Sequence, residues 1–398
     1  MSAMGNDVDH NISSTALDEW EQLIIRYNIR PLSSAGYIGC AVYLVIIGVI
    51  ATVGNLTTLI MFSRNKKLRN KPHNMLLINL AASDLGISVF GYPLTTSSCF
   101  AQRYLWGMVG CKVQGFATFF FAMADMYTLT MVSVYRWVAV CVPEYNYILN
   151  FSLTMKVILG TWVAAFLTTA PPLVGMSEYT FEPFGTSCTI DWDDPSPLNV
   201  FYVYLLVFVA YVLPVAVMCY CYYKVRVFVA VMCYCYYKVR VSVAVMCYCY
   251  YKVRVSVAVM CYCYYKVRVS VAVMCYCYYK VVIRSNQLVR AMKMAQRKTM
   301  TLGEAEDANI TLAENKVTWI SLIMVTVFVI IWSPYTFVCV WAIYDKDIPV
   351  WLNTLPTMCA KASCMLNPVI FYLTNPVFRN TFMATFCRNK VTPLPKNM

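Results

Sequence analysis

Long apolar runs, each followed by a polar connection, recur along most of the chain. Each run reaches or exceeds the ~20 residues that an α-helix needs to cross the hydrocarbon core of a bilayer. The runs cover residues 37–62, 74–100, 111–140, 155–176, 198–223, 317–344 and 350–372. The pattern predicts an all-α membrane protein in which residues 37–372 form a seven-transmembrane-helix bundle.

Composition agrees with a membrane protein, because 60% of the 398 residues are hydrophobic and only 13% are charged. Basic residues gather in two connections: Arg64, Lys66, Lys67, Arg69, Lys71, Lys293, Arg297 and Lys298. The N-terminal tail carries acids: Asp7, Asp9, Asp18, Glu19 and Glu21. Since short cytoplasmic loops are enriched in Lys and Arg, we predict an extracellular N-tail over 1–36 and a cytoplasmic C-tail over 373–398.

The N-tail has no positively charged region followed by a short apolar region. We therefore expect no cleaved signal peptide, and insertion through the first span. On the predicted outer side, Asn11-Ile12-Ser13 matches the acceptor pattern for N-glycosylation.

A 14-residue unit, VAVMCYCYYKVRVS or a close variant, occurs five times without a break over residues 215–284. Its period is too short for a solenoid repeat, and the apolar stretch in each copy is too short to cross a bilayer as a helix. We interpret four copies as a duplication or a sequence-assembly error, with a functional insertion as the alternative. Each copy adds one Lys, one Arg and two Cys, so without four copies the net charge falls from +13 to +5 and the cysteines from 19 to 11. The charge then no longer points to nucleic acid or anionic lipid as a partner, and the cysteine count says nothing about partners.

Lys361 stands near the middle of the seventh apolar run. Either end of 350–372 lies about 16 Å away at the helical rise of ~1.5 Å per residue, too far for the side chain to reach the membrane edge. An amine in apolar surroundings is more easily buried without its proton, and it is then a nucleophile toward aldehydes. Lys361 is therefore predicted to hold a carbonyl ligand as a Schiff base.

Motifs along the predicted spans resemble those of rhodopsin-type G-protein-coupled receptors. In chain order they are Gly54-Asn55, Leu80-Ala81-Ala82-Ser83-Asp84, Arg136, Trp162, Pro214, Trp332-Ser333-Pro334-Tyr335 and Asn367-Pro368. Lys361, six residues before Asn367, narrows the resemblance to opsins. Within the opsins, EPFGTSCTIDW at 182–192 resembles neuropsins, whereas WSPYTFVCVW at 332–341 and the MCYCYYKV end of the fifth span resemble peropsins.

The resemblance to opsins implies retinal, as the 11-cis or all-trans isomer, bound covalently to Lys361. The position where vertebrate visual pigments resemble one another in carrying a glutamate is Gln114 here, which is neutral and is expected in the pocket. Glu182 aligns with the second-loop glutamate of many non-visual opsins and is the predicted counterion, with Glu178 and Asp191 as the alternatives.

Further pocket features also follow from the resemblance. Cys111 and Cys188 match a disulfide pair that would fold Glu182 over the pocket. Trp332 and Tyr335, one turn apart on a helix with a proline, would present aromatic surface to the ligand, although core packing would also explain them.

Asp84, Asp125 and Asn367 align with positions that face one another below the pocket, where such receptors resemble each other in holding water or sodium. Two carboxylates that close cannot both stay ionised without a cation, so a proton or a sodium ion is expected between them. We interpret this cluster as a conformational switch, with a specialised ion pathway as the alternative.

The cytoplasmic motifs depart from the family pattern. The acid-Arg-aromatic triplet reads Tyr135-Arg136-Trp137, so Arg136 lacks its neighbouring carboxylate, and Glu314 aligns with the residue that can still pair with Arg136. The Asn-Pro-x-x-Tyr motif ends in Phe371, which has no hydroxyl to stabilise an active state.

The chain after the seventh span carries apolar residues every four positions: Phe378, Phe382 and Phe386. This spacing predicts a short amphipathic cytoplasmic helix on the membrane surface, with Cys387 as a palmitoylation site.

The resemblance implies a light-sensing receptor in the plasma membrane or a photoreceptor membrane, with a heterotrimeric G protein and arrestin as partners. A retinal photoisomerase of the peropsin or retinochrome kind is the alternative, favoured by Tyr135 and Phe371. Arg136 and Glu314 favour signalling. A receptor for a diffusible ligand fits less well, and so does a transporter, because no repeat of the spans is evident.

Overall fold

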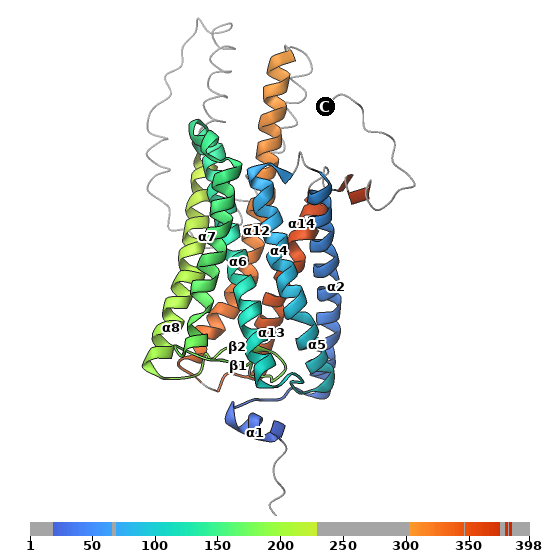
Figure 1. Ribbon diagram of the computed structural model, residues 1–398, viewed down its shortest axis with the longest axis vertical. Helices are drawn as coiled ribbons and strands as arrows, with labels where there is room; N and C mark the ends of the chain where they lie inside the picture. Colours follow the sequence, from blue (N-terminus) through green and yellow to red (C-terminus); the bar gives the residue numbers. More distant parts are fainter. Residues whose placement is uncertain are drawn as a thin grey trace, which may run out of the picture. The chain divides into compact units, whose positions relative to one another are not determined.

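The computed structural model describes residues 19–65, 69–228, 302–345, 347–374, 379–380 and 382–383, with the backbone alone for 19 and 302–316. The chain divides into two compact units, Met1–Val225 with Trp319–Met398, and Arg226–Thr318. The first unit contains the helical bundle in Figure 1, and the predicted site lies in it.

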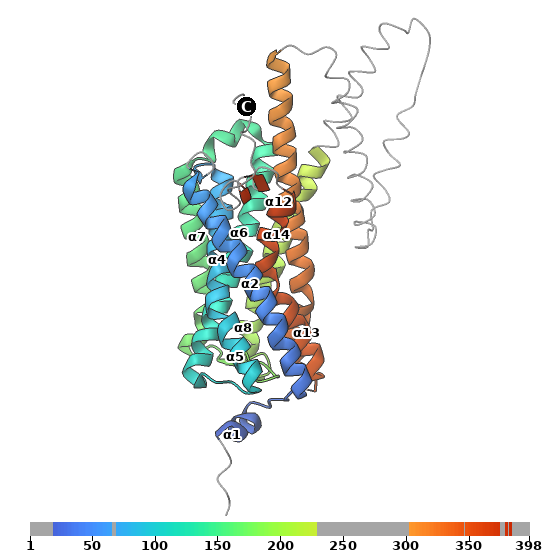
Figure 2. The same ribbon diagram turned by 90° about the vertical axis from the view of Figure 1, so that its right-hand side faces the viewer.

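The bundle agrees with the predicted seven-helix architecture. Among the described residues, six helical segments are long and apolar enough to cross a membrane: Ser34–Arg64, Pro72–Ala101, Gly107–Cys141, Phe151–Thr169, Pro197–Phe228 and Val317–Ala342. The seventh predicted span consists of two shorter helices, α13 (Val350–Lys361) and α14 (Ser363–Thr374). These two helices continue one another along the bundle (Figure 2). The side of the membrane on which the N-terminus lies stays a prediction.

The longer elements are α2 (Ser34–Arg64), α4 (Pro72–Phe90), α5 (Tyr92–Ala101), α6 (Gly107–Cys141), α7 (Phe151–Thr169), α8 (Pro197–Val207) and α12 (Leu302–Ala342). Shorter ones are α1 (Glu19–Arg26), η1 (Pro143–Ile148), η2 (Pro171–Val174), the π-helical turn η3 (Phe208–Val212), and the strands β1 (Tyr179–Phe181) and β2 (Cys188–Ile190).

Prolines explain two differences from the predicted spans. The second span is interrupted at Gly91, between α4 and α5, because Pro93 has no backbone N–H to continue the helical hydrogen bonds. The fourth span was expected over 155–176, but α7 ends at Thr169 and the prolines that follow form only the short helix η2.

The described part of the five-copy repeat is its first copy, residues 215–228, which continues the fifth helix to Phe228. One copy therefore completes a membrane span. The interpretation of the other four copies concerns 229–284, which lie outside the described residues.

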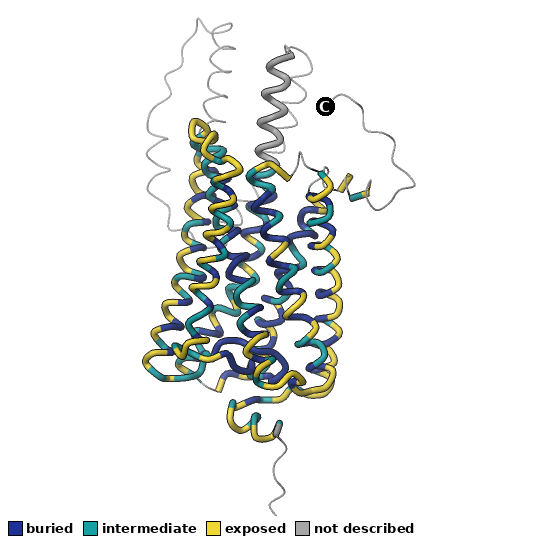
Figure 3. Tube along the Cα trace, viewed as in Figure 1, coloured by how far each residue is buried: buried dark blue, intermediate teal, exposed yellow. Residues whose placement is uncertain are grey.

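The centre of the bundle is α6, which packs against α4 and α7. Two hydrogen bonds join these helices, from Trp162 Nε1 to Asn79 Oδ1 at 2.8 Å and from Asn79 Nδ2 to Thr128 Oγ1 at 2.8 Å. Figure 3 shows buried positions concentrated inside the bundle, whereas the outer helices are exposed along much of their length. Because lipid is as apolar as a protein core, apolar residues such as Ile46 and Val53 of α2 can lie on the outside.

An antiparallel hairpin and the N-terminal segment close one end of the bundle (Figure 1). In the hairpin, Tyr179 lies opposite Ile190 and Phe181 opposite Cys188. The N-terminal segment is fastened to the loop between the strands by a hydrogen bond from Arg30 N to Pro183 O at 2.7 Å. The loop is thus held between the bundle and residues 19–30.

Candidate functional site

Lys361 lies at a cavity inside the bundle, beneath the hairpin. The cavity has a volume of about 70 Å³, and its lining residues come from six helices (α4, α5, α6, α12, α13 and α14) and from the hairpin region. Glu182, Lys361, Trp332 and Tyr335 all line it, together with apolar and aromatic side chains such as Phe119. Four of the five residues predicted from sequence for ligand binding are therefore brought together at one cavity.

The Lys361 side chain points toward the hairpin. Its Nζ atom donates a hydrogen bond to Ser187 Oγ at 3.0 Å. Within the part of the chain that the structure describes, no direct ion pair joins Lys361 to an acid. Ser187, directly before Cys188, was not identified from sequence because a serine in a loop carries no pattern of its own.

Glu182 follows the last residue of β1, and its backbone N–H bonds to Ser187 O at 2.8 Å, which continues the strand pairing by one residue. The side chain is buried, with 4% of its surface exposed. Burial raises the pKa of Glu182 from 4.5 to about 7, an effect that the nearby Lys361 and hydrogen bonds from Thr357 and Tyr335 partly offset. The carboxyl group is thus in an apolar site and within the electrostatic reach of Lys361.

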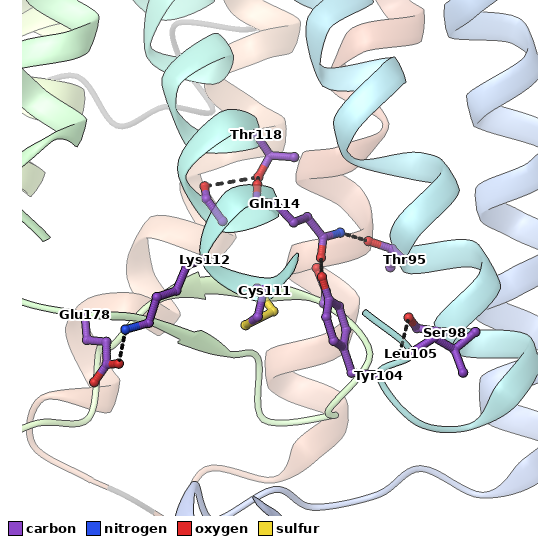
Figure 4. The surroundings of a disulfide bond; sticks show 12 residues. Thr95, Ser98, Tyr104, Leu105, Cys111, Lys112, Gln114, Thr118 and Glu178 are labelled. Carbon is purple, nitrogen blue, oxygen red and sulfur yellow. Dashed lines mark hydrogen bonds and ion pairs between the residues drawn. A yellow bond between two sulfur atoms is a disulfide. The ribbon is translucent and has the colours of Figure 1, made fainter. Parts of the chain in front are cut away.

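The two acids that were the alternative counterions, Glu178 and Asp191, bond to groups other than Lys361. Glu178 forms an ion pair with Lys112 at 2.8 Å, with both side chains about half exposed (Figure 4). Asp191 accepts hydrogen bonds from the backbone of Asp193 and Asp194, at 3.0 and 3.2 Å. Neither acid lines the cavity, so the geometry favours Glu182 over both.

Gln114 is buried but does not line the cavity. Its Oε1 accepts from Tyr104 OH at 2.8 Å, and its Nε2 donates to Thr95 Oγ1 at 2.6 Å (Figure 4). The same Nε2 also donates to Gly91 O at 3.3 Å. The amide is therefore fully engaged in joining α6 to α5 and the following loop. A neutral donor and acceptor suits this position better than a carboxylate would.

The predicted disulfide between Cys111 and Cys188 is present (Figure 4). It joins the first part of α6 to the first residue of β2. Since Ser187 and Glu182 are paired next to Cys188, this covalent bond fixes the side of the hairpin that faces Lys361.

Aromatic side chains connect the cavity to α12. Trp332 lies 6.0 Å from the ring of Tyr335 and stacks on Phe328 at 5.5 Å. The hydroxyl groups of Tyr335 and Thr189 are 2.9 Å apart, which links α12 directly to β2. The aromatic pair predicted from sequence thus contacts both the cavity and the hairpin.

The predicted polar cluster is assembled below the cavity. Asn367 Nδ2 donates to Asp84 Oδ2 at 2.9 Å, Ser83 donates to Asp125, and all four side chains are buried. The carboxyl groups of Asp84 and Asp125 also lie within hydrogen-bonding reach of each other. Among the described residues, no group of three or more His, Cys, Asp or Glu side chains could hold a metal ion.

The two motif departures occupy buried positions. Tyr135 OH donates to Thr154 Oγ1 at 3.1 Å, and Phe371 packs in an apolar cluster at the end of the bundle that is distant from the hairpin. Arg136 is buried near the C-terminal end of α6. The side chain of Glu314, both Asn11 and Cys387, and most of the predicted helix after the seventh span lie outside the described residues.

Comparison with known proteins agrees with this architecture. Residues 54–371 match the 7 transmembrane receptor (rhodopsin family). Human Opsin-5 is 30% identical over 333 residues, which cover 83% of this chain and 76% of that protein. The human visual pigment-like receptor peropsin is 27% identical over 349 residues, which cover 87% of this chain and 83% of that protein. The crystal structure of squid rhodopsin has the same fold, with a TM-score of 0.68 at 23% identity over 91% of this chain and 88% of that chain. The chain is therefore an opsin, a member of the rhodopsin family of seven-transmembrane receptors.

Proposed function

We propose that the protein is a photopigment that binds retinal covalently through Lys361, with Glu182 as the counterion. The observation that carries this proposal is that the Lys361 amine and the Glu182 carboxyl group line one cavity inside the bundle. A primary amine in an apolar site can condense with the aldehyde of retinal, and a nearby carboxylate stabilises the positive charge on the resulting nitrogen.

The lining residues suit this ligand chemically. An amine, a single buried acid and aromatic walls match an aldehyde on a long apolar chain. A cavity of about 70 Å³ is smaller than typical ligand pockets of roughly 300 Å³ or more, so binding requires lining side chains to turn aside. When bound, retinal supplies the absorption of light and a change of shape.

The chain's own residues position the Lys361 amine and transmit a change of shape in the cavity to α12. The strand pairing and the disulfide keep Glu182 and Ser187 next to the Lys361 amine. Trp332 and Tyr335 border the same cavity and lie around Pro334, where α12 lacks a backbone N–H and bends more easily. Pressure on these rings is therefore expected to move α12.

We further propose that this motion is read by a heterotrimeric G protein, with arrestin as a second partner, at the plasma membrane or a photoreceptor membrane. Support comes from Arg136, which stands near the C-terminal end of α6, and from the basic connection at Arg64, Arg69 and Lys71. A shift between two receptor conformations needs only a few kcal/mol of differential interaction.

A second candidate function is retinal photoisomerisation with little or no G-protein activation. The observation that favours it is the burial of Phe371 in an apolar cluster, where it offers no hydroxyl for an active-state hydrogen bond. Tyr135 in place of an acid beside Arg136 points the same way. Light absorption is common to both functions, whereas signalling separates them.

One set of measurements tests both functions. The full chain is reconstituted with 11-cis and with all-trans retinal, spectra are recorded before and after illumination, and nucleotide exchange on G proteins is followed. We expect a visible pigment that Lys361→Ala abolishes, and an absorption shift toward the ultraviolet in Glu182→Gln, because the nitrogen loses its counterion. Absence of a pigment with either isomer would refute the photopigment proposal, and a pigment without nucleotide exchange would select the photoisomerase.

A further inference from the structure

The seventh span is interrupted directly after Lys361. In a continuous α-helix the backbone N–H of Met365 would bond to the Lys361 carbonyl oxygen four residues earlier. Here Met365 N donates to Ala362 O at 3.2 Å, in the tighter three-residue pattern. The carbonyl group of Lys361 therefore needs a donor from outside the helix, because an unpaired backbone group is costly in an apolar interior.

Tyr92 supplies that donor. Its hydroxyl group donates a hydrogen bond to Lys361 O at 2.6 Å. Two similar bonds reach the same span from α2, from Tyr43 OH to Met358 O at 3.2 Å and from Asn55 Nδ2 to Cys364 O at 2.9 Å. The Tyr92 bond is the shortest of the three. It is also the one of these three whose acceptor is the carbonyl oxygen of Lys361, the residue with the reactive amine.

The position of Tyr92 follows from two local features. The break at Gly91 makes Tyr92 the first residue of α5 and turns it toward α13 and α14. A Cβ atom at Gly48 of α2 would lie 3.1 Å from Tyr92 Cγ, so a side chain at this position would press on the ring and require it to shift by a few tenths of an ångström. The ring is buried, with 5% of its surface exposed, and lines the same cavity as Lys361.

The Lys361 side chain is held separately from its backbone, because its Nζ atom donates to Ser187 Oγ at 3.0 Å. Lys361 is consequently held at two points, by Tyr92 at its backbone and by Ser187 at its Nζ atom.

We infer that Tyr92 is a positioning residue for Lys361: its hydroxyl replaces the missing helical hydrogen bond and fixes the direction in which the amine enters the cavity. The effect of Tyr92 on a retinal pigment rests on the proposed function. Its effect on the reactivity of the Lys361 amine does not, because that reactivity can be measured in the protein without retinal.

Tyr92→Phe tests the inference because it removes one oxygen atom and keeps the ring. Tyr43→Phe is the matched control, since it removes a hydroxyl that bonds to the same span three residues earlier and does not line the cavity. In the protein without retinal, Lys361 is trapped with a small aldehyde and cyanoborohydride, and the modified peptide is quantified by mass spectrometry. We expect roughly two- to tenfold faster trapping in Tyr92→Phe and the wild-type rate in Tyr43→Phe.

In the pigment, hydroxylamine in the dark should bleach Tyr92→Phe faster by a similar factor, with a displaced absorption maximum, while Tyr43→Phe keeps the wild-type rate and spectrum. Equal trapping and bleaching rates in wild type and Tyr92→Phe would overturn the inference. If wild type forms no pigment, the proposed function fails, but the trapping rates still decide the role of Tyr92. If Tyr92→Phe does not accumulate, Gly48→Ala, which keeps the hydroxyl but presses on the ring, is the second variant, and an unchanged trapping rate there overturns the inference.

Discussion

The charge on Lys361 should be measurable through the ionisation of Glu182. Burial raises the pKa of Glu182 to about 7, and the Lys361 ammonium is the largest of the effects that oppose this rise. At pH 7 about half of the molecules should therefore carry an ionised Glu182. The perturbation is Lys361→Met, which removes the positive charge and keeps an unbranched apolar side chain at this position.

The size of the effect follows from the geometry. The two groups are not in direct contact within the described residues, so their separation exceeds about 4 Å, where unit charges interact by at most about 4 kcal/mol at an effective dielectric constant of ~20. Since one pKa unit corresponds to about 1.4 kcal/mol, the pKa of Glu182 should rise by one to three units in Lys361→Met. The ionised fraction at pH 7 then falls from about one half to below about one tenth.

Infrared spectroscopy of the protein without retinal measures this titration directly, through the stretching band of the protonated carboxyl group. Subtraction of the Glu182→Gln spectrum isolates the band of this residue. A midpoint near pH 7 in wild type and a higher one in Lys361→Met are expected. An equal midpoint in the two proteins would refute an electrostatic link between Lys361 and Glu182, and a wild-type midpoint near 4.5 would refute the burial of the carboxyl group.

Three further predictions concern the hairpin and the distant end of the bundle. Cys111→Ser opens a disulfide with a sequence separation of 77 and should lower stability by about 4 kcal/mol, seen as faster thermal inactivation, whereas Cys359→Ser, at an exposed free cysteine, should not. Gly185→Ala should destabilise the protein more than Gly175→Ala in the same assay. Both glycines have positive φ, but a Cβ at Gly185 would lie 2.6 Å from Ile29 of the N-terminal segment, whereas a Cβ at Gly175 would meet nothing within 4 Å. Equal losses of stability would mean that the contact with Ile29 is unimportant. Phe371→Tyr should leave the absorption spectrum unchanged and increase light-dependent nucleotide exchange, and an unaltered exchange rate would show that the missing hydroxyl does not limit signalling.

The spans were predictable because a bilayer imposes a minimum length on every apolar helix. The pattern placed Lys361 in the middle of the seventh run, and it did so without any knowledge of the neighbouring helices. The interruptions at Gly91 and Ala362 were not predicted, because the apolar pattern continues through both positions. The break at Ala362 depends on a donor from another helix, the hydroxyl of Tyr92, which bonds to the carbonyl oxygen of Lys361.

The site was partly predictable for a related reason. A lysine in an apolar span is conspicuous by itself, and the resemblance to opsins identified Glu182 and the cysteine pair. Gln114 was expected beside the ligand, but its amide bonds to Thr95 and Tyr104. The partners of a buried amide depend on the neighbouring segments, which no sequence pattern reports.

The amino-acid sequence by itself determined that this protein spans a membrane with seven helices and buries one amine in the middle of the last, because water-to-lipid transfer acts on each segment separately. Only the tertiary structure decided which acid lines the same cavity as that amine and which groups bond to Lys361. Those choices depend on distances between residues as far apart in sequence as Tyr92, Glu182 and Lys361, which are fixed by the packing of the helices and by the disulfide across the hairpin.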